Sequence, residues 1–463
     1  MIRPRSIVKG VARIVLWTLA VLVAFVVLWF AGNRWLDESP EPNRDSFLVS
    51  ASDQLPDEGN IAIGILGLTA PRGNDFLEYG AKVKALNSAN APWPEVQQMV
   101  RGPNTLQPTT ESQQITCWLD PDGLQIKGCL PFDQAPAVLA ENREILERYK
   151  QLHQMKTYSG LGWSNNQAYL SVAKLAVAEI HVDLRKRDAA SAYRKWRDQV
   201  SFARNTLRGP DTWVGKAVAL VAIGMSLPAL ENILLADPKL AKQNASELKT
   251  MLRSEGIKEF NPEGIMRAEY VLLRNALKSE PQQIGDWPVD RLHWLAYHLG
   301  QRERILNRYY FFALDYAAIL GLPWPQFEKE MQRLRETFDY PTKWDISVDP
   351  FGSLFLADYV EGQLKTREMI RQMHIIDGRL RLSTLLVRII DEKIADTDIA
   401  QFLESAGPEF FDPFTGKPMR WDPKQRTIYF PDPEYPCAMY ASLRVPPATT
   451  RSATAPQADG KKC

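Results

Sequence analysis

The N-terminus constrains this chain most strongly, because it carries a long apolar run without a charged residue. The run extends from Ile14 to Gly32, and about 20 apolar residues are enough to cross a bilayer core as a helix. Basic residues precede the run and acidic residues dominate after it, so the positive-inside rule places the start of the chain in the cytoplasm. We therefore predict a basic cytoplasmic tail at residues 1–13 and a transmembrane anchor at residues 14–35.

A cleaved signal peptide and a buried core helix are the alternatives to a permanent anchor. A signal peptide has a shorter apolar core and a small-residue cleavage site, whereas this run ends in Trp29-Phe30-Ala31-Gly32-Asn33-Arg34-Trp35. A uniform apolar run behind a basic tail also argues against a core helix. We expect a single-pass protein of the bacterial inner membrane, with its N-terminus in the cytoplasm and its bulk in the periplasm.

Charge and cysteine content narrow the classes of function. The formal net charge is +1, which gives no indication of nucleic-acid binding. The four cysteines suit a compartment in which disulfides persist. Cys117 and Cys129 flank a turn sequence, so we predict a disulfide between them; the absence of a histidine nearby in the sequence argues against a metal site. A second bridge between Cys437 and Cys463 and a free thiol at Cys463 are both compatible with the sequence.

The composition divides the chain beyond the anchor into segments. Proline, serine and acidic residues after the anchor are typical of a spacer. Apolar residues at helical spacing dominate the middle of the chain. The segments we predict are a spacer at 36–58, a small mixed region with the Cys117/Cys129 loop at 59–134, a helical body at 135–406, a β-hairpin docked on the body at 407–446, and a disordered tail at 447–463.

Several local signals refine these segments. Asn60 to Ala70 is compatible with a buried strand or a short helix, and the proline-rich stretch from Ala91 to Thr110 is expected to be mostly loop. Asp211 or Thr212 is suited to cap a helix, and Pro228 is expected to kink or break that helix. Further along the chain, Asn261-Pro262 combines an N-cap with a proline at the first helical position.

The C-terminal part predicts a β-hairpin. Pro418–Trp421 and Thr427–Phe430 flank Asp422-Pro423-Lys424-Gln425, which is a good hairpin turn. The predicted fold class is therefore mainly α: an N-terminal transmembrane helix, an extracytoplasmic helical bundle or irregular α-solenoid, and a small C-terminal β-hairpin.

Motifs for nucleotide and metal sites fail on spacing. Gly209-Pro-Asp-Thr-Trp-Val-Gly215-Lys216-Ala217 is one residue too long for a phosphate-binding loop, and Ala217 replaces the hydroxyl that would hold magnesium. His293 and His298 are one position too far apart to share a helix face. We therefore predict no nucleotide, no cofactor and no metal.

Carboxylates leave the one open catalytic question. A pair of acids suffices for glycosidase-type chemistry and leaves no local motif. Glu269 lies in an otherwise apolar helical stretch and is the candidate functional residue. A salt bridge to Arg267 or Arg274, or plain exposure, is its structural alternative.

Two segments carry a family resemblance. The helix start Asp349-Pro350-Phe351-Gly352 leads through helices to the closing hairpin segment Asp412-Pro-Phe-Thr-Gly-Lys-Pro-Met-Arg420, and Leu207–Leu235 combines a long helix, a Gly/Pro break and an apolar helix. This pattern resembles a loosely related set of single-pass, membrane-anchored helical bacterial envelope proteins with no known activity. The resemblance implies an envelope location and assigns no functional residue.

Three classes of function are compatible with these observations. The favoured one is a non-enzymatic module that binds or helps assemble another envelope protein. The alternatives are a carboxylate-dependent hydrolase or lyase acting on envelope polymers, and a receptor for a small molecule or peptide. A deep pocket with paired acids would indicate the enzyme, a deep pocket lined by tryptophan the receptor, and an exposed apolar patch the binding module.

Overall fold

The computed structural model describes eight stretches of the chain and some single positions at 17–32 and 295–298. Most of the predicted anchor, the rest of the expected spacer after residue 44, and the tail after residue 446 lie outside the described residues, as do Cys117, Cys129, Cys437 and Cys463 with their predicted disulfides. The described stretches are residues 37–44, 59–88, 93–111, 132–159, 165–278, 300–337, 348–431 and 439–446.

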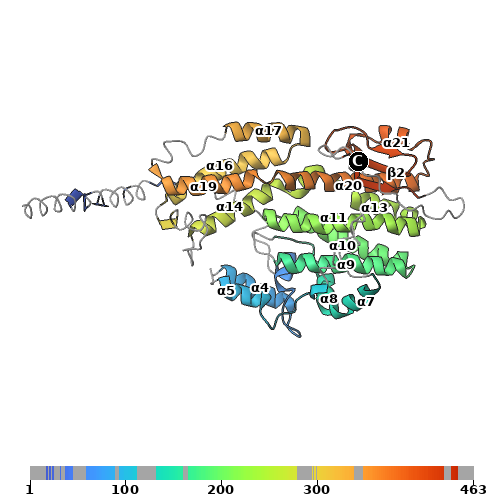
Figure 1. Ribbon diagram of the computed structural model, residues 1–463, viewed down its shortest axis with the longest axis horizontal. Coiled ribbons are helices and arrows are strands. Elements are labelled where there is room, and N and C mark those ends of the chain that lie inside the picture. Colours follow the sequence, from blue (N-terminus) through green and yellow to red (C-terminus); the bar gives the residue numbers. More distant parts are fainter. Residues whose placement is uncertain are drawn as a thin grey trace, which may run out of the picture. The chain divides into compact units, whose positions relative to one another are not determined.

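The protein is mainly helical with a small antiparallel sheet (Figure 1), which confirms that part of the predicted fold class. The chain forms two compact units, and each is built from segments that are far apart in the sequence. Unit 1 comprises residues 1–48, 270–313 and 334–365; unit 2 comprises residues 49–269, 314–333 and 366–463.

Unit 2 begins with a close-packed pair of helices, followed by a third. Asn60 caps the first helix, since its Oδ1 accepts a hydrogen bond from the N–H of Ala62 at 3.0 Å. Gly67 lets the first two helices touch through their backbones, because a Cβ there would lie 1.7 Å from the carbonyl oxygen of Phe76. The segment that was compatible with strand or helix is thus helical. The three helices are α3 (Ile61–Gly67), α4 (Phe76–Ser88) and α5 (Trp93–Arg101).

The helix α5 occupies residues 93–101 of the segment that was expected to be mostly loop, whereas residues 102–109 are turn and loop as expected. Pro94 lies in its first turn, where a backbone N–H has no intrahelical partner to lose. Proline therefore begins this helix instead of excluding it. Tyr79 of α4 joins the two helices by donating its hydroxyl to the carbonyl oxygen of Met99 at 2.7 Å.

The centre of unit 2 is a set of packed helices. Helices α9, α10 and α11 contact one another (Figure 1). Trp196 of α10 is fully buried, and its Nε1–H donates to the carbonyl oxygen of Ser226 in α11 at 2.9 Å. The indole is therefore buried without an unsatisfied donor. The elements are η3 (Phe132–Gln134), α7 (Ala135–Glu141), α8 (Arg143–Leu152), α9 (Asn166–Arg185), α10 (Ala189–Arg208) and α11 (Trp213–Ala236).

Pro228 lies inside α11 and does not break it, so the expectation that the helix breaks there is wrong. An interior proline removes the hydrogen bond to the carbonyl four residues earlier, which here is that of Gly224. This carbonyl oxygen instead accepts a hydrogen bond from Nη1 of Arg379 at 3.2 Å. A side chain from another helix supplies the missing donor, and α11 continues to Ala236.

The remaining helices complete both units. The boundaries between the units fall inside α14, α16 and α17, so each of these helices has residues in both. Asn261 and Asp349 cap α14 and α19 as their sequences indicate, each accepting from the N–H three residues later. The elements are α12 (Lys239–Gln243), α13 (Ala245–Leu252), η4 (Gly256–Phe260), α14 (Pro262–Lys278), α16 (Arg302–Leu320), α17 (Trp324–Thr337), α19 (Pro350–Leu364), α20 (Arg367–Asp391), α21 (Ile399–Ser405) and η5 (Pro408–Phe410).

The C-terminal sheet contains the predicted hairpin and one further strand. Asp422 forms the turn, accepting hydrogen bonds from the N–H groups of Lys424 and Gln425 at 2.8 and 3.2 Å. Phe430 packs so closely on α20 that a Cβ at Gly378 would lie 2.4 Å from its ring. The strands are β1 (Arg420–Asp422), β2 (Thr427–Pro431) and β3 (Met439–Arg444), antiparallel in the order β1-β2-β3.

Candidate functional site

Glu269, the candidate carboxylate, belongs to α14 and contacts the first residue of α11. The residue is 7% exposed, and its Oε1 accepts a hydrogen bond from the N–H of Trp213 at 3.1 Å. N–H groups in the first turn of a helix lack intrahelical acceptors, and the positive end of the helix dipole favours a carboxylate there. This contact gives Glu269 a structural role at the start of α11. Arg267, one of its expected partners, forms an ion pair with Glu263.

Asp211, two residues before Trp213, is a second buried carboxylate. It is 1% exposed, and it accepts hydrogen bonds from the Tyr158 hydroxyl and, at 2.7 Å, from the N–H of Thr212. Burial and the neighbouring carboxylate raise the pKa of Tyr158 well above its usual value. A Cβ at Gly215 would lie 1.8 Å from an Asp211 oxygen, so glycine is required for the carboxylate to fit.

Lys216 is the third buried charged group of this cluster. Its Nζ donates to the carbonyl oxygens of Leu207 and Gly209, at the end of α10. Burial lowers the pKa of Lys216 to about 7, with the charge of Asp211 opposing that shift. The amine is completely buried, so it holds the end of α10 to the start of α11 and is not placed to meet a substrate.

The segment that resembled a phosphate-binding loop is therefore a helix start. Thr212 is the N-cap of α11, and its hydroxyl accepts a hydrogen bond from the N–H of Gly215 at 3.4 Å. Helix α10 precedes the segment where a nucleotide-binding loop would need a strand. Glycine and lysine at these positions serve the packing of Asp211 and the carbonyls of α10.

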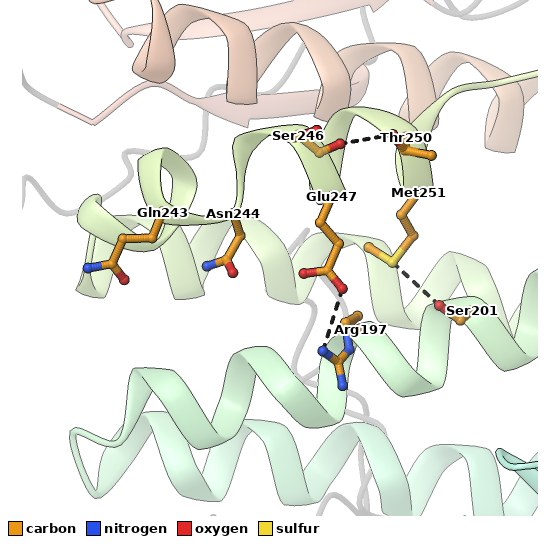
Figure 2. A pocket seen from close by; sticks show the side chains of 8 residues that line it. All are labelled: Arg197, Ser201, Gln243, Asn244, Ser246, Glu247, Thr250 and Met251. Atoms are coloured by element: carbon orange, nitrogen blue, oxygen red, sulfur yellow. Dashed lines mark hydrogen bonds and ion pairs between the residues drawn. The ribbon is translucent and has the colours of Figure 1, made fainter.

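An open polar groove lies between α10 and α13 (Figure 2). It has a volume of about 660 Å³. Glu247 and Met251 point across it towards Arg197 and Ser201, with Arg197 Nη1 3.5 Å from Glu247 Oε1. Glu247 is the one acid among the described residues that line it. The groove is lined by Arg197, Ser201, Gln243, Asn244, Ser246, Glu247, Thr250 and Met251.

A second groove of about 540 Å³ lies between the C-terminal half of α16 and α17. Its acid, Glu330, is 3.2 Å from Arg333. Neither groove has paired acids or a tryptophan among the described residues that line it. Both grooves thus lack the features by which the enzyme and the receptor would be recognised in this part of the protein.

One face of α11 carries exposed apolar side chains. Val214 and Val221 are 60% and 44% exposed, and Val218 and Met225 between and after them are partly exposed. Spacings of four and three residues place these four side chains on one side of the helix. We call them the α11 apolar row. The opposite side of the helix is core, with Ile223, Leu230 and Ile233 buried.

Only part of the membrane prediction and part of the metal prediction concern residues that the structure describes. By length and composition, α11 is the one described helix able to cross a membrane, and a core helix meets the same criterion. No cluster of three or more potential metal-ligating side chains occurs in the described part of the chain. His298 lies 4.8 Å from the Tyr297 ring in an edge-on contact, while His293 lies outside the described residues.

Sequence reasoning did not anticipate the buried cluster or the groove. Tyr158 lies 53 residues from Asp211, and Arg197 lies 50 residues from Glu247. A single sequence contains no local signal for either pairing. No family model, no curated protein and no solved structure matches this chain.

Proposed function

We propose that the chain is a non-enzymatic binding or assembly module of the bacterial cell envelope, tethered to the inner membrane by residues 14–35. The α11 apolar row is the observation that carries this proposal. Contiguous apolar patches on a protein surface are typical of interaction sites, and the four side chains of the row adjoin one another along one helix face. The partner we propose is another envelope protein that presents an apolar helix or strand to this row.

The energy available from the row is large enough for its loss to be measured in a binding assay. The exposed fractions of Val214 and Val221, 60% and 44%, together equal about one whole valine side chain. Burying that much apolar surface contributes about 1.5–3 kcal/mol, which is about 10- to 150-fold in a dissociation constant. Loss of either side chain should therefore weaken binding of the partner measurably, without disturbing the buried side of α11.

The apolar N-terminal run supports the tether. Trp17, Val21 and Val23 are helical and 68%, 64% and 55% exposed. Apolar side chains at such exposure are stable in lipid and costly in water. The compartment, the orientation and the family resemblance remain parts of the proposal. Alkaline extraction tests the tether, since the full-length protein should stay with the membrane.

Site-specific photocrosslinking in intact cells tests the binding face. A photoreactive residue at Val221 should give an adduct with a distinct envelope protein, and the adduct should disappear when Val214→Ser is added. The exposed Arg194 of α10 provides the control position, which should give no such adduct. Equal adducts at both positions, or none at Val221, would contradict the proposal. An adduct between two copies of this chain would show that the row binds a second copy and not a distinct envelope protein.

A further inference from the structure

The residues that follow the predicted anchor are bonded to the start of α16, within unit 1. The carboxylate of Asp37 accepts hydrogen bonds from the N–H of Glu303 at 3.0 Å and the N–H of Arg304 at 3.1 Å. These are N–H groups of the first helical turn, which have no intrahelical acceptor. Asp37 therefore caps α16 from 266 residues away in the sequence.

Asn307, one turn further along α16, holds the rest of the segment. Its Nδ2 donates to Oε2 of Glu38 at 3.2 Å and to the carbonyl oxygen of Ser39 at 2.9 Å. Its Oδ1 accepts from the N–H of Glu41 at 3.0 Å and from Nη1 of Arg44 at 2.8 Å. One side-chain amide thus uses both of its donors and both of its lone pairs, and Asn307 is 6% exposed.

Arg44 forms an ion pair with Glu303 at the end of the segment. Its Nη2 lies 2.5 Å from Oε2 of Glu303, and its side chain is 7% exposed. A partly buried pair of this kind is screened by salt much less than an exposed one. We call residues 37–44, held in this way, the clasp.

We infer that the clasp, in place of a free spacer, mounts unit 1 directly on the membrane surface. The inference rests on the proposed anchor at residues 14–35. A flexible chain over residues 36–58 would allow a reach of about 25 Å. With the clasp closed, Leu36 alone lies between Trp35 and Asp37, and each residue spans at most about 3.6 Å. Asp37 is then held within about 7 Å of the end of the anchor, and the start of α16, which is bonded to the Asp37 carboxylate, lies next to the phospholipid headgroups.

Limited trypsin digestion tests the clasp, because Arg44 is itself a cleavage site. The full-length protein is reconstituted in phospholipid vesicles with its large domain outside. Mass spectrometry then follows the rate of cleavage at the Arg44–Asp45 bond. The wild type should be cut slowly there, because the arginine is buried. Asn307→Ala should be cut about tenfold faster or more, since it removes a charge-assisted hydrogen bond and exposes Arg44. Asn232→Ala on α11 is the matched control and should be cut like the wild type.

A second variant guards against loss of folding. Asn307 is buried, whereas Asp37→Ala changes only the clasp side of the contact, and it should also accelerate cleavage at Arg44. Equal cleavage rates in the wild type and in Asp37→Ala, with unchanged circular dichroism, would overturn the inference. Failure of the anchor is a separate result: alkali would release the uncut protein from the vesicles, while clasp-dependent cleavage would persist as a property of unit 1.

Discussion

Arg379 should stabilise unit 2 largely because Pro228 is present. Arg379→Met removes the donor that reaches the carbonyl oxygen of Gly224 at 3.2 Å and keeps most of the apolar stem. Hydrogen bonds to charged groups contribute about 1.5–3 kcal/mol. This distance is at the long end of the normal range, so we expect a loss of about 1.5 kcal/mol in the free energy of unfolding.

Pro228→Ala should make most of that loss disappear. Alanine restores a backbone N–H, which can bond to the carbonyl of Gly224 within α11. In this background the arginine is redundant, and Arg379→Met should cost about 0.5 kcal/mol or less, consistent with a residue that retains only its packing. The double-mutant cycle should therefore show a coupling of about 1 kcal/mol between two residues that are far apart in the sequence.

Urea denaturation followed by far-UV circular dichroism measures all four proteins of the cycle. Midpoints are compared at a common slope, because extrapolated free energies carry errors of about 10–15%. Arg194→Met, at an exposed position of α10, is the matched control and should leave the midpoint unchanged. A coupling below about 0.3 kcal/mol would refute the reasoning, since it would mean that the helix passes through Pro228 without help from Arg379.

Three further predictions concern helices and their junctions, and the change in stability in each is measured from urea midpoints. Burial lowers the pKa of Lys216 to about 7 from its usual 10.5. Between pH 7 and 9 the unfolded chain therefore binds more protons than the folded protein, and the free energy of unfolding should rise by up to about 1.4 kcal/mol per pH unit. Lys216→Met should abolish this rise, whereas the exposed Lys242→Met should not. Glu269→Gln should keep the acceptor for the first N–H of α11 and leave the cellular phenotype intact, whereas Glu269→Leu should cost about 1–3 kcal/mol. Gly67→Ala, whose Cβ would lie 1.7 Å from a backbone oxygen, should cost about 3 kcal/mol or more, while Gly362→Ala in α19, which meets nothing within 4 Å, should add about 0.5–1 kcal/mol.

Local chemistry was sufficient to predict much of the fold. Thr212, Asn261 and Asp349 cap helices where their sequence context indicated, because a cap acts on N–H groups only two or three residues away. The β1–β2 hairpin followed from the Asp422 turn for the same reason. These features depend on short segments and need no knowledge of the tertiary structure.

The features that sequence reasoning missed depend on distant residues. Pro228 is tolerated because Arg379, 155 residues away, reaches the carbonyl that the proline leaves free. The buried Lys216 cluster is invisible in the sequence, because Tyr158 and Asp211 meet only in the folded protein. The apolar row could not be predicted as exposed, since α11 is apolar on all sides and its periodicity does not say which side is core.

The clasp also bears on how the protein is made. Arg44 and Glu303 are separated by 259 residues, and ribosomes add about 5–20 residues per second. Residues 37–44 therefore wait about 13–50 seconds for the helix that receives them. During synthesis this short acidic stretch is open to proteases and chaperones, and its closure marks a chain whose translation has passed α16.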